Sequence, residues 1–279
     1  MVDYLIPSSV KEVLKFINEN KSKMISGGTD LMVQRRNWAD VKALFDEKEV
    51  YIFNLTELKY INSLVGELHI GATTPVSDIL NDERTPKLLK ESIEIMASPA
   101  LRNLATLPGN IMNASPAGDT LPILYVLDAK AVIESVDGRR IEDVEQIITG
   151  PRKTILKQNE MITEIIIPFS DFTHQTFVKV GGRKADAISK LSFTGAAKVV
   201  DGVVEDLRIA FGAVGPLIVR KREIENKYIG LTVKEIVERI QEVIEDYSPF
   251  ITPIDDQRSS KEYRKKVSIN LVKDFIERL

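Results

Sequence analysis

The chain has 279 residues, of which 43% are hydrophobic, with 38 Lys and Arg against 41 Asp and Glu and no cysteine. Without cysteine, and with only His69 and His174, it cannot form disulfides, thiolate zinc sites, iron–sulfur clusters or a cysteine nucleophile, so any redox chemistry needs an organic cofactor. The formal net charge of -3 also argues against a nucleic-acid-binding protein.

Hydropathy predicts where the protein resides. No run of about 18 apolar residues occurs, as a membrane-spanning helix would need. The first residues, Met1 to Tyr4, lack the basic and then apolar layout of a signal peptide. We therefore expect a cytoplasmic protein.

The N-terminal part alternates helix and strand signals. Ser9 and Glu12 form a capping-box pattern ahead of a helix whose apolar face repeats with helical spacing. A short apolar run at 24–26 then meets Gly27 and Gly28 and leads into a new element at 29–33, which predicts a strand, a glycine turn and a helix start. Further strands are predicted at 51–55 and 68–72, and an amphipathic helix at 86–96.

The middle of the chain has dense turn signals. Three Gly or Pro positions interrupt residues 106–119, and a helix is predicted from Asp119 as N-cap, with Pro122 in its first turn. Residues 131–141 predict a hairpin around Asp137 and Gly138. Residues 161–167 predict one more strand, closed by Pro168.

A polar stretch at 170–175 marks a domain boundary. Strands are predicted beyond it at 176–180, 191–199 and 203–211, followed by helices at 233–247 and 259–279. Strands first and helices afterwards predict an α+β second domain with a small antiparallel sheet.

Gly27 and Gly28 lie between a strand and a helix start, where backbone N–H groups are free and glycine lets a phosphate approach the main chain. A simple tight turn is the other interpretation. The third glycine of the GxGxxG fingerprint is absent, which disfavours a Rossmann nucleotide site.

A second loop follows about 80 residues later. It offers N–H groups at Gly109 and Asn110, hydroxyls at Thr106 and Ser115, and the Asp119 carboxylate, which could accept from a sugar hydroxyl. Alternatively, Asp119 only caps its helix and Asn110 only braces a turn. Two such loops without a basic cluster favour one long diphosphate ligand.

Several motifs, in order, carry a family resemblance. They are Gly-Gly-Thr-Asp-Leu from Gly27, Thr-Leu-Pro-Gly-Asn from Thr106, Ala-Ser-Pro-Ala-Gly-Asp from Ala114, Gly-Pro-Arg-Lys-Thr from Gly150, Phe-Val-Lys from Phe177, residues 182–188, Phe-Gly-Ala-Val from Phe211, and residues 260–265. Together they resemble the FAD-binding subunit of the molybdenum hydroxylases, the family of carbon monoxide dehydrogenase, xanthine dehydrogenase and aldehyde oxidoreductases.

The resemblance implies an α+β fold with two domains. Residues 1–170 would form a two-part FAD-binding domain of the vanillyl-alcohol-oxidase (PCMH) type, with subdomains at about 1–55 and 56–170. Residues 171–279 would form the smaller C-terminal domain of the carbon monoxide dehydrogenase flavoprotein type, with an antiparallel sheet and helices.

The resemblance also implies cofactor contacts, spread over several segments. The diphosphate would be wrapped by Met24, Ile25, Ser26, Gly27, Gly28, Thr29, Asp30 and Leu31. Thr106, Gly109 and Asn110 would bind the same ligand from the second loop, with Ser115 beside them and Asp119 at the ribose or adenine end. Met96 and Ile162 would touch the cofactor, Lys179 would lie near the flavin, and Asp186 and Ile188 would belong to a loop over its ring.

Two of these positions have open alternatives. Lys179 could be a solvated strand residue, and the 182–188 loop could be a surface loop without a role. Pro108 departs from the family pattern, in which two glycines often precede the asparagine, and its missing N–H puts one phosphate contact in question. No histidine or cysteine is suited to covalent flavin attachment.

The implied function is electron transfer within a heterotrimer. FAD in this medium subunit would receive electrons from [2Fe–2S] clusters in a small subunit and pass them to an outside acceptor, while a large subunit oxidises substrate at molybdopterin. We expect no catalytic and no metal-binding residues in this chain, and an aldehyde as substrate ahead of carbon monoxide or an N-heterocycle. The alternatives are a non-redox nucleotide- or phosphate-binding module and a stand-alone flavin oxidase of the same fold.

Overall fold

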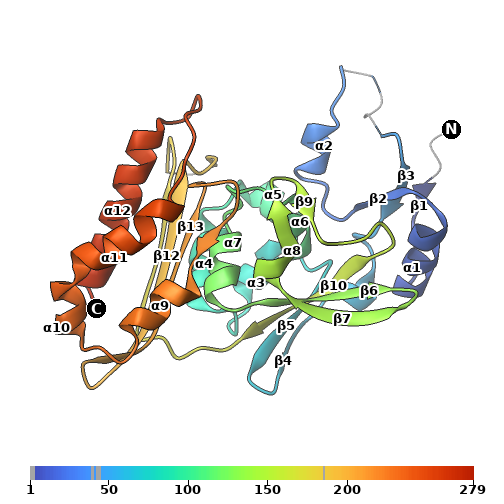
Figure 1. Cartoon of the computed structure of the whole chain (residues 1–279). Coiled ribbons are helices and arrows are strands. Elements are labelled where there is room, and N and C mark those ends of the chain that lie inside the picture. Colours follow the sequence, from blue (N-terminus) through green and yellow to red (C-terminus); the bar gives the residue numbers. More distant parts are fainter. Residues whose placement is uncertain (1–3, 39–40, 42–44, 185) are drawn as a thin grey trace. The chain divides into compact units, whose positions relative to one another are not determined.

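The computed structural model describes residues 4–38, 41, 45–184 and 186–279, and its contacts divide the chain into two compact units (Figure 1). The first unit consists of Met1–Thr85, Ala97–Ala114 and Asp128–Pro168. The second consists of Pro86–Met96, Ser115–Leu127 and Phe169–Leu279. The second unit therefore takes two segments from the N-terminal part of the chain, and the boundary placed near residue 170 from the sequence stays a prediction.

The first unit is built on sheets with short helices around them. Its strands are β1 Tyr4–Leu5, β2 Ser22–Ile25, β3 Lys48–Tyr51, β4 Ile61–Leu64, β5 Glu67–Gly71, β6 Lys130–Ser135, β7 Gly138–Asp143, β8 Ile148–Gly150, β9 Lys153–Thr154 and β10 Met161–Pro168. Its helices are α1 Val10–Glu19, α2 Leu31–Gln34, the 3-10 turn η1 Thr56–Leu58, α3 Val76–Asn81, α5 Pro99–Arg102, α6 Leu107–Asn113 and α8 Val144–Ile147.

Two kinds of sheet occur in this unit. A parallel sheet has the order β1-β3-β2, and an antiparallel sheet has the order β4-β5-β10-β6-β7, with β8 and β9 paired separately. The parallel sheet places the end of β2 beside β3, which is where the glycine turn begins. The hairpin predicted at 131–141 is present, although its turn is Val136–Asp137 and Gly138 already pairs with Ser135.

The N-terminal helix forms as predicted, with a shifted capping pattern. Ser9 accepts from the Glu12 N–H at 3.2 Å, and the apolar face of α1 is buried. The Glu12 carboxylate accepts from the Ser8 N–H at 2.8 Å, not from that of Ser9. The two halves of the predicted capping box therefore fall on neighbouring residues.

The prediction of a strand at 51–55 is wrong. The strand β3 ends at Tyr51, and the Leu55 N–H donates to the Ile52 carbonyl at 3.0 Å in a turn that leads into η1. Ile52 and Leu55 are nonetheless buried. A short apolar run indicates that its residues are buried, but it does not distinguish a buried turn from a buried strand.

The second unit is a layered α+β structure. Its strands are β11 His174–Val180, β12 Leu191–Val200, β13 Val203–Gly212 and β14 Val219–Arg220. Its helices are α4 Lys87–Glu94, α7 Leu121–Val126, α9 Arg222–Tyr228, α10 Val233–Glu238, α11 Ile240–Tyr247, the 3-10 turn η2 Ser248–Phe250 and α12 Lys261–Glu277.

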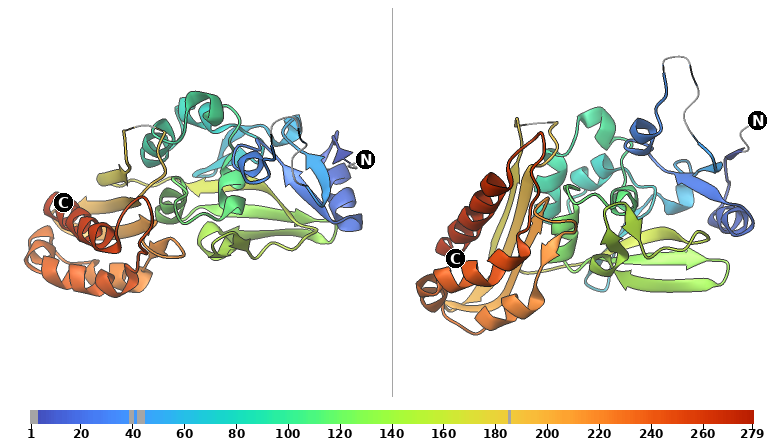
Figure 2. Two further views of the ribbon diagram at one scale, coloured as in Figure 1. Left: turned by 90° about the horizontal axis from the view of Figure 1, so that it is seen from above. Right: turned by 45° about the horizontal axis from the view of Figure 1, so that its top comes forward.

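These strands pair in the order β11-β12-β13-β14, all antiparallel. Figures 1 and 2 show α11 and α12 on one side of this sheet, and α7 and α4 lie on the other side. Residues 191–197 are consequently buried without alternation, because both faces of β12 are covered. The helix predicted at 233–247 is interrupted at Arg239, where α10 ends and α11 begins.

A buried ion pair ties α7 into the second unit. Arg220 ends β14, and its guanidinium lies 3.0 Å from the Glu225 carboxylate. Its guanidinium also donates to the Tyr125 carbonyl of α7. Burial raises the pKa of Glu225 above its ordinary value, and Arg220 opposes that shift.

Candidate functional site

The turn between β2 and α2 presents unused backbone donors. Within residues 4–38, 41, 45–184 and 186–279, the N–H groups of Gly27, Gly28, Thr29 and Asp30 donate to no acceptor. Gly28 has φ +66°, a left-handed conformation in which glycine is unstrained. Consecutive free N–H groups between a strand and a helix form a concave anion site, so this turn can hold a phosphate.

The turn is packed against a segment about 80 residues away in the chain. A Cβ added to Gly27 would lie 1.7 Å from the Leu104 carbonyl oxygen, so only glycine fits there. The Thr106 hydroxyl donates to the Ser26 hydroxyl at 3.4 Å. The structure therefore brings the two glycine segments together within the first unit.

The second segment is not the open loop expected from its glycine and proline. Thr106 is the N-cap of α6, and its hydroxyl accepts from the Gly109 N–H at 3.2 Å. The Asn110 N–H donates to the Thr106 carbonyl at 3.0 Å. The two N–H groups predicted to be free at Gly109 and Asn110 are thus used within the helix.

Pro108 explains why a helix can start here. It lies in the first turn of α6, where an N–H has no partner within the helix in any case. Its missing donor therefore costs the helix nothing. The Pro–Gly pair, which usually marks a turn, here occupies positions that also suit a capped helix start.

A polar cluster that the sequence did not predict adjoins the glycine turn. The Arg152 guanidinium donates to Asn113 Oδ1 at 2.8 Å and lies 3.4 Å from Asp30 Oδ2. The Gln34 amide donates to Asp30 and, at 3.1 Å, to Asn113. We call Asp30, Gln34, Asn113 and Arg152 the Arg152 cluster. It joins residues up to 122 positions apart, a distance at which spacing gives no signal.

The second unit holds a buried polar group around Asp119. The Lys179 ammonium donates to Asp119 Oδ2 at 2.7 Å and to the Ile95 carbonyl at 3.1 Å. Ser189 donates to Asp119 Oδ1 at 2.7 Å. The Lys179 side chain is only 5% exposed, so the alternative of a solvated strand residue is wrong.

Asp119 does not cap the following helix. Thr120 is the N-cap residue of α7, and both Asp119 carboxylate oxygens are used by Lys179 and Ser189. The helix nevertheless contains Pro122 in its first turn, as predicted. The sequence therefore located the helix, and tertiary contacts decided what the acid binds.

The other expected cofactor contacts divide between the units. Met24, Ile25 and Leu31 flank the glycine turn, and Ile162 is buried in β10 of the first unit. Met96, two residues beyond the end of α4, and Ser115 belong to the second unit and are half-buried. In the 182–188 loop, Asp186 has a left-handed backbone and Ile188 is exposed, and Ala185 lies outside the described residues.

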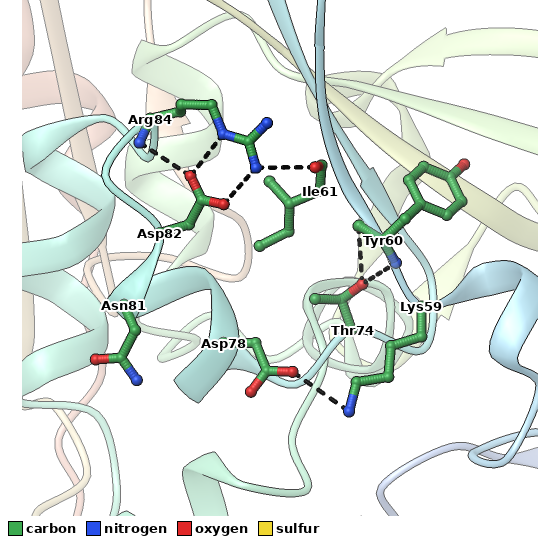
Figure 3. Close-up of a pocket in the computed structure, with 8 residues that line it drawn as sticks. All are labelled: Lys59, Tyr60, Ile61, Thr74, Asp78, Asn81, Asp82 and Arg84. Atoms are coloured by element: carbon green, nitrogen blue, oxygen red, sulfur yellow. Dashed lines mark hydrogen bonds and ion pairs between the residues drawn. The ribbon is translucent and has the colours of Figure 1, made fainter.

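A groove of about 470 Å³ in the first unit is a competing candidate (Figure 3). Lys59 pairs with Asp78 at 3.3 Å, and the Arg84 guanidinium donates to both oxygens of the Asp82 carboxylate. The formal charges of the groove therefore cancel, and its cations are already paired. The glycine turn, with four free donors, is the better anion site. The competing groove is lined by Lys59, Tyr60, Ile61, Thr74, Asp78, Asn81, Asp82 and Arg84.

Comparison with known families covers nearly the whole chain. Residues 1–170 match the family described as the FAD binding domain in molybdopterin dehydrogenase. Residues 176–279 match the family described as the CO dehydrogenase flavoprotein C-terminal domain.

Individual relatives match over similar lengths. The medium chain of glyceraldehyde dehydrogenase from Sulfolobus acidocaldarius is 28% identical over 270 residues, covering 95% of this chain and 93% of its own. The FAD subunit of nicotinate dehydrogenase from Eubacterium barkeri is 30% identical over 240 residues, covering 82% of this chain and 79% of its own.

A solved structure confirms the predicted fold class. Carbon monoxide dehydrogenase from Hydrogenophaga pseudoflava contains a chain that superposes with a TM-score of 0.88 at 24% identity, covering 99% of this chain and 96% of that one. At this identity the likeness establishes the fold alone. In the described residues, no helix is long and apolar enough to cross a membrane.

Proposed function

Since this chain belongs to the FAD-binding subunits of the molybdenum hydroxylase family, which are oxidoreductase components, we propose that it transfers electrons between a partner subunit and an external acceptor. The electrons come from [2Fe–2S] clusters in a small subunit. Substrate is oxidised at a molybdopterin site in a large subunit, so this chain needs no catalytic acid, base or nucleophile of its own.

The observation that carries the proposal is the row of four free N–H groups at the glycine turn. The residues present fit the cofactor, because a diphosphate needs several donors and a main chain without Cβ atoms in its way. Gly27 and Gly28 meet the second requirement. Hydrogen bonds to a charged group contribute about 1.5–3 kcal/mol each, so four can hold FAD without a covalent bond.

FAD, when bound, supplies the capacity to take up and release electrons. In this proposal Gly27, Gly28, Thr29 and Asp30 bind the diphosphate through their backbone N–H groups. The start of α6 from Thr106 to Asn110 lies beside them and supports the same ligand. Because the Gly109 and Asn110 N–H groups bond within α6, this segment supports the ligand by its shape rather than by the free donors first expected.

The Asp119 group has a separate role in this proposal. A buried, hydrogen-bonded ammonium at Lys179 keeps a positive charge at a defined place, with its position held by Asp119 and the Ile95 carbonyl. Because Asp119 balances this charge, Lys179 would act on a bound flavin as the positive end of an ion pair, which would favour the reduced form of the ring. We assign Lys179 this tuning role, with Met96 and Ile162 as apolar contacts.

For the substrate of the assembled enzyme we propose an aldehyde. The support is that one whole-length relative is a glyceraldehyde dehydrogenase medium chain. The nicotinate dehydrogenase subunit supports an N-heterocycle as second candidate, and carbon monoxide is third. The heterotrimer and a cytoplasmic location belong to the same proposal.

The first experiment asks whether the purified chain binds FAD. We expect a yellow protein with an absorption band at about 450 nm that dithionite bleaches, or a colourless one that acquires the band on incubation with FAD. Protein that stays colourless with excess FAD contradicts the proposal and favours the phosphate-binding module.

The second experiment separates a subunit from a stand-alone flavin oxidase. Affinity purification from the source cells should recover two further chains together with molybdenum and iron. Recovery of a single flavoprotein that oxidises a substrate by itself contradicts the subunit proposal. Aldehydes, nicotinate and carbon monoxide are then compared as electron donors to the purified complex.

A further inference from the structure

Two residues with a left-handed backbone lie in and next to the Arg152 cluster. Ala114, at the end of α6, has φ +46°, and Arg152 has φ +59°. The Arg152 N–H donates to the Ala114 carbonyl at 3.0 Å, so the two left-handed residues are held against each other. Non-glycine residues adopt this conformation only at a cost, and such residues concentrate at functional sites.

Stability does not account for the arrangement. The Asp30 and Arg152 side chains are 49% and 56% exposed, and ion pairs that exposed contribute little to folding. The strained backbone nonetheless aims Arg152 at Asn113 and Asp30. The cluster therefore has its main effect on what lies next to it, which is the glycine turn.

Electrostatics at the turn identifies that effect. In the proposed function the Asp30 N–H is one of the four donors to the diphosphate, so the carboxylate of this residue is a negative charge at the edge of an anion site. Two negative groups that lie close together repel each other unless a cation lies between or behind them. Arg152 is the cation that contacts Asp30, and the Gln34 amide donates to the same Asp30 oxygen, Oδ2.

We propose that Arg152 is a positioning residue of the FAD diphosphate site, which cancels the charge of Asp30 and holds Asp30 and Asn113 in place at the glycine turn. This inference rests on the proposed function and adds to it a residue of the Gly150–Thr154 motif. One guanidinium nitrogen, Nη1, makes both contacts, and it lies 2.8 Å from Asn113 Oδ1 and 3.4 Å from Asp30 Oδ2.

The test measures the Kd of FAD for the full chain, freed of flavin, by titration of flavin fluorescence. Arg152→Gln should raise the Kd about tenfold at low salt, equivalent to about 1.4 kcal/mol, because the carboxylate is then uncompensated. The Kd of Arg152→Lys should lie between those of the wild type and Arg152→Gln. In the Arg152→Gln, Asp30→Asn double variant, the Kd should return to within about threefold of the wild type.

Two controls separate this role from a general structural one. Arg84→Gln removes a similarly exposed arginine that also pairs with an aspartate in the same unit, and should leave the Kd unchanged. The deficit of Arg152→Gln should also shrink between about 50 and 500 mM salt, because salt screens the repulsion. A residue that only braces the fold would show neither the rescue by Asp30→Asn nor this salt dependence.

The outcomes are distinguishable. A Kd of Arg152→Gln within about twofold of the wild type, or a double variant as weak as Arg152→Gln alone, overturns the inference and leaves the proposed function intact. Wild-type protein that does not bind FAD at all overturns both.

Discussion

Gly27→Ala is the sharpest perturbation of the proposed phosphate site. The added Cβ would lie 1.7 Å from the Leu104 carbonyl oxygen and 2.4 Å from its carbon, both backbone atoms that no side-chain rotation can move. An ordinary contact begins at 3.4 Å, so the glycine turn and the Leu104 segment must separate by about 1.7 Å. A hydrogen bond is lost over such a displacement.

The expected loss of affinity follows from the number of donors involved. If two of the four N–H contacts fail, at about 1.5–3 kcal/mol each, binding weakens by about 3–6 kcal/mol, which corresponds to a Kd raised at least about 100-fold. Gly28→Ala should be milder. Its Cβ would meet the flexible Met32 side chain at 3.3 Å, and the left-handed backbone adds about 1–2 kcal/mol of strain.

The assay is the same flavin titration, accompanied by thermal unfolding. Gly66→Ala is the matched control, because Gly66 has φ +80° in the β4–β5 hairpin and its Cβ would meet nothing within 4 Å. We expect the Kd to rise in the order Gly66→Ala, Gly28→Ala, Gly27→Ala. A Gly27→Ala protein that folds and binds FAD within about threefold of the wild type would refute the assignment of the turn.

Three further predictions concern the second unit. Lys179→Met should lower the free energy of unfolding by about 3–5 kcal/mol in urea, because it leaves the Asp119 carboxylate buried without its cation, and adding Asp119→Asn should recover part of that loss. Hydrogen bonding to Arg264 lowers the pKa of Asp256 from 3.8 to about 2, so its stabilising contribution is complete above about pH 4 and is lost as the pH falls towards 2. The urea stability gap between wild type and Asp256→Asn should therefore shrink over that pH range, and a constant gap contradicts the pairing. Gly195→Ala would place a Cβ 2.8 Å from the Phe275 ring and should lower the free energy of unfolding by about 1–3 kcal/mol. An unchanged melting temperature would contradict this close packing of Gly195 against Phe275.

Much of the secondary structure was readable from local patterns. Some features depend only on residues that are close together in the chain, and the sequence therefore predicts them. They are the Ser9 cap, the proline that ends β10 and the succession of strands and turns in 174–212. Errors occurred where burial came without a characteristic period. The residues after Tyr51 are buried in a turn, and the Pro–Gly pair after Thr106 starts a helix.

The sequence alone was sufficient to predict the family and the cofactor, and it indicated the glycine turn that we propose as the anchor. Ordered motifs and the absence of cysteine do not depend on how distant segments meet. Tertiary structure decided what each polar group binds. It placed Leu104 where only glycine can approach, used the Gly109 and Asn110 donors within α6, paired Asp119 with Lys179, and brought Arg152 to Asp30. Such partners are set by packing between segments up to 122 residues apart, and neither residue of a pair carries a local sign of the other.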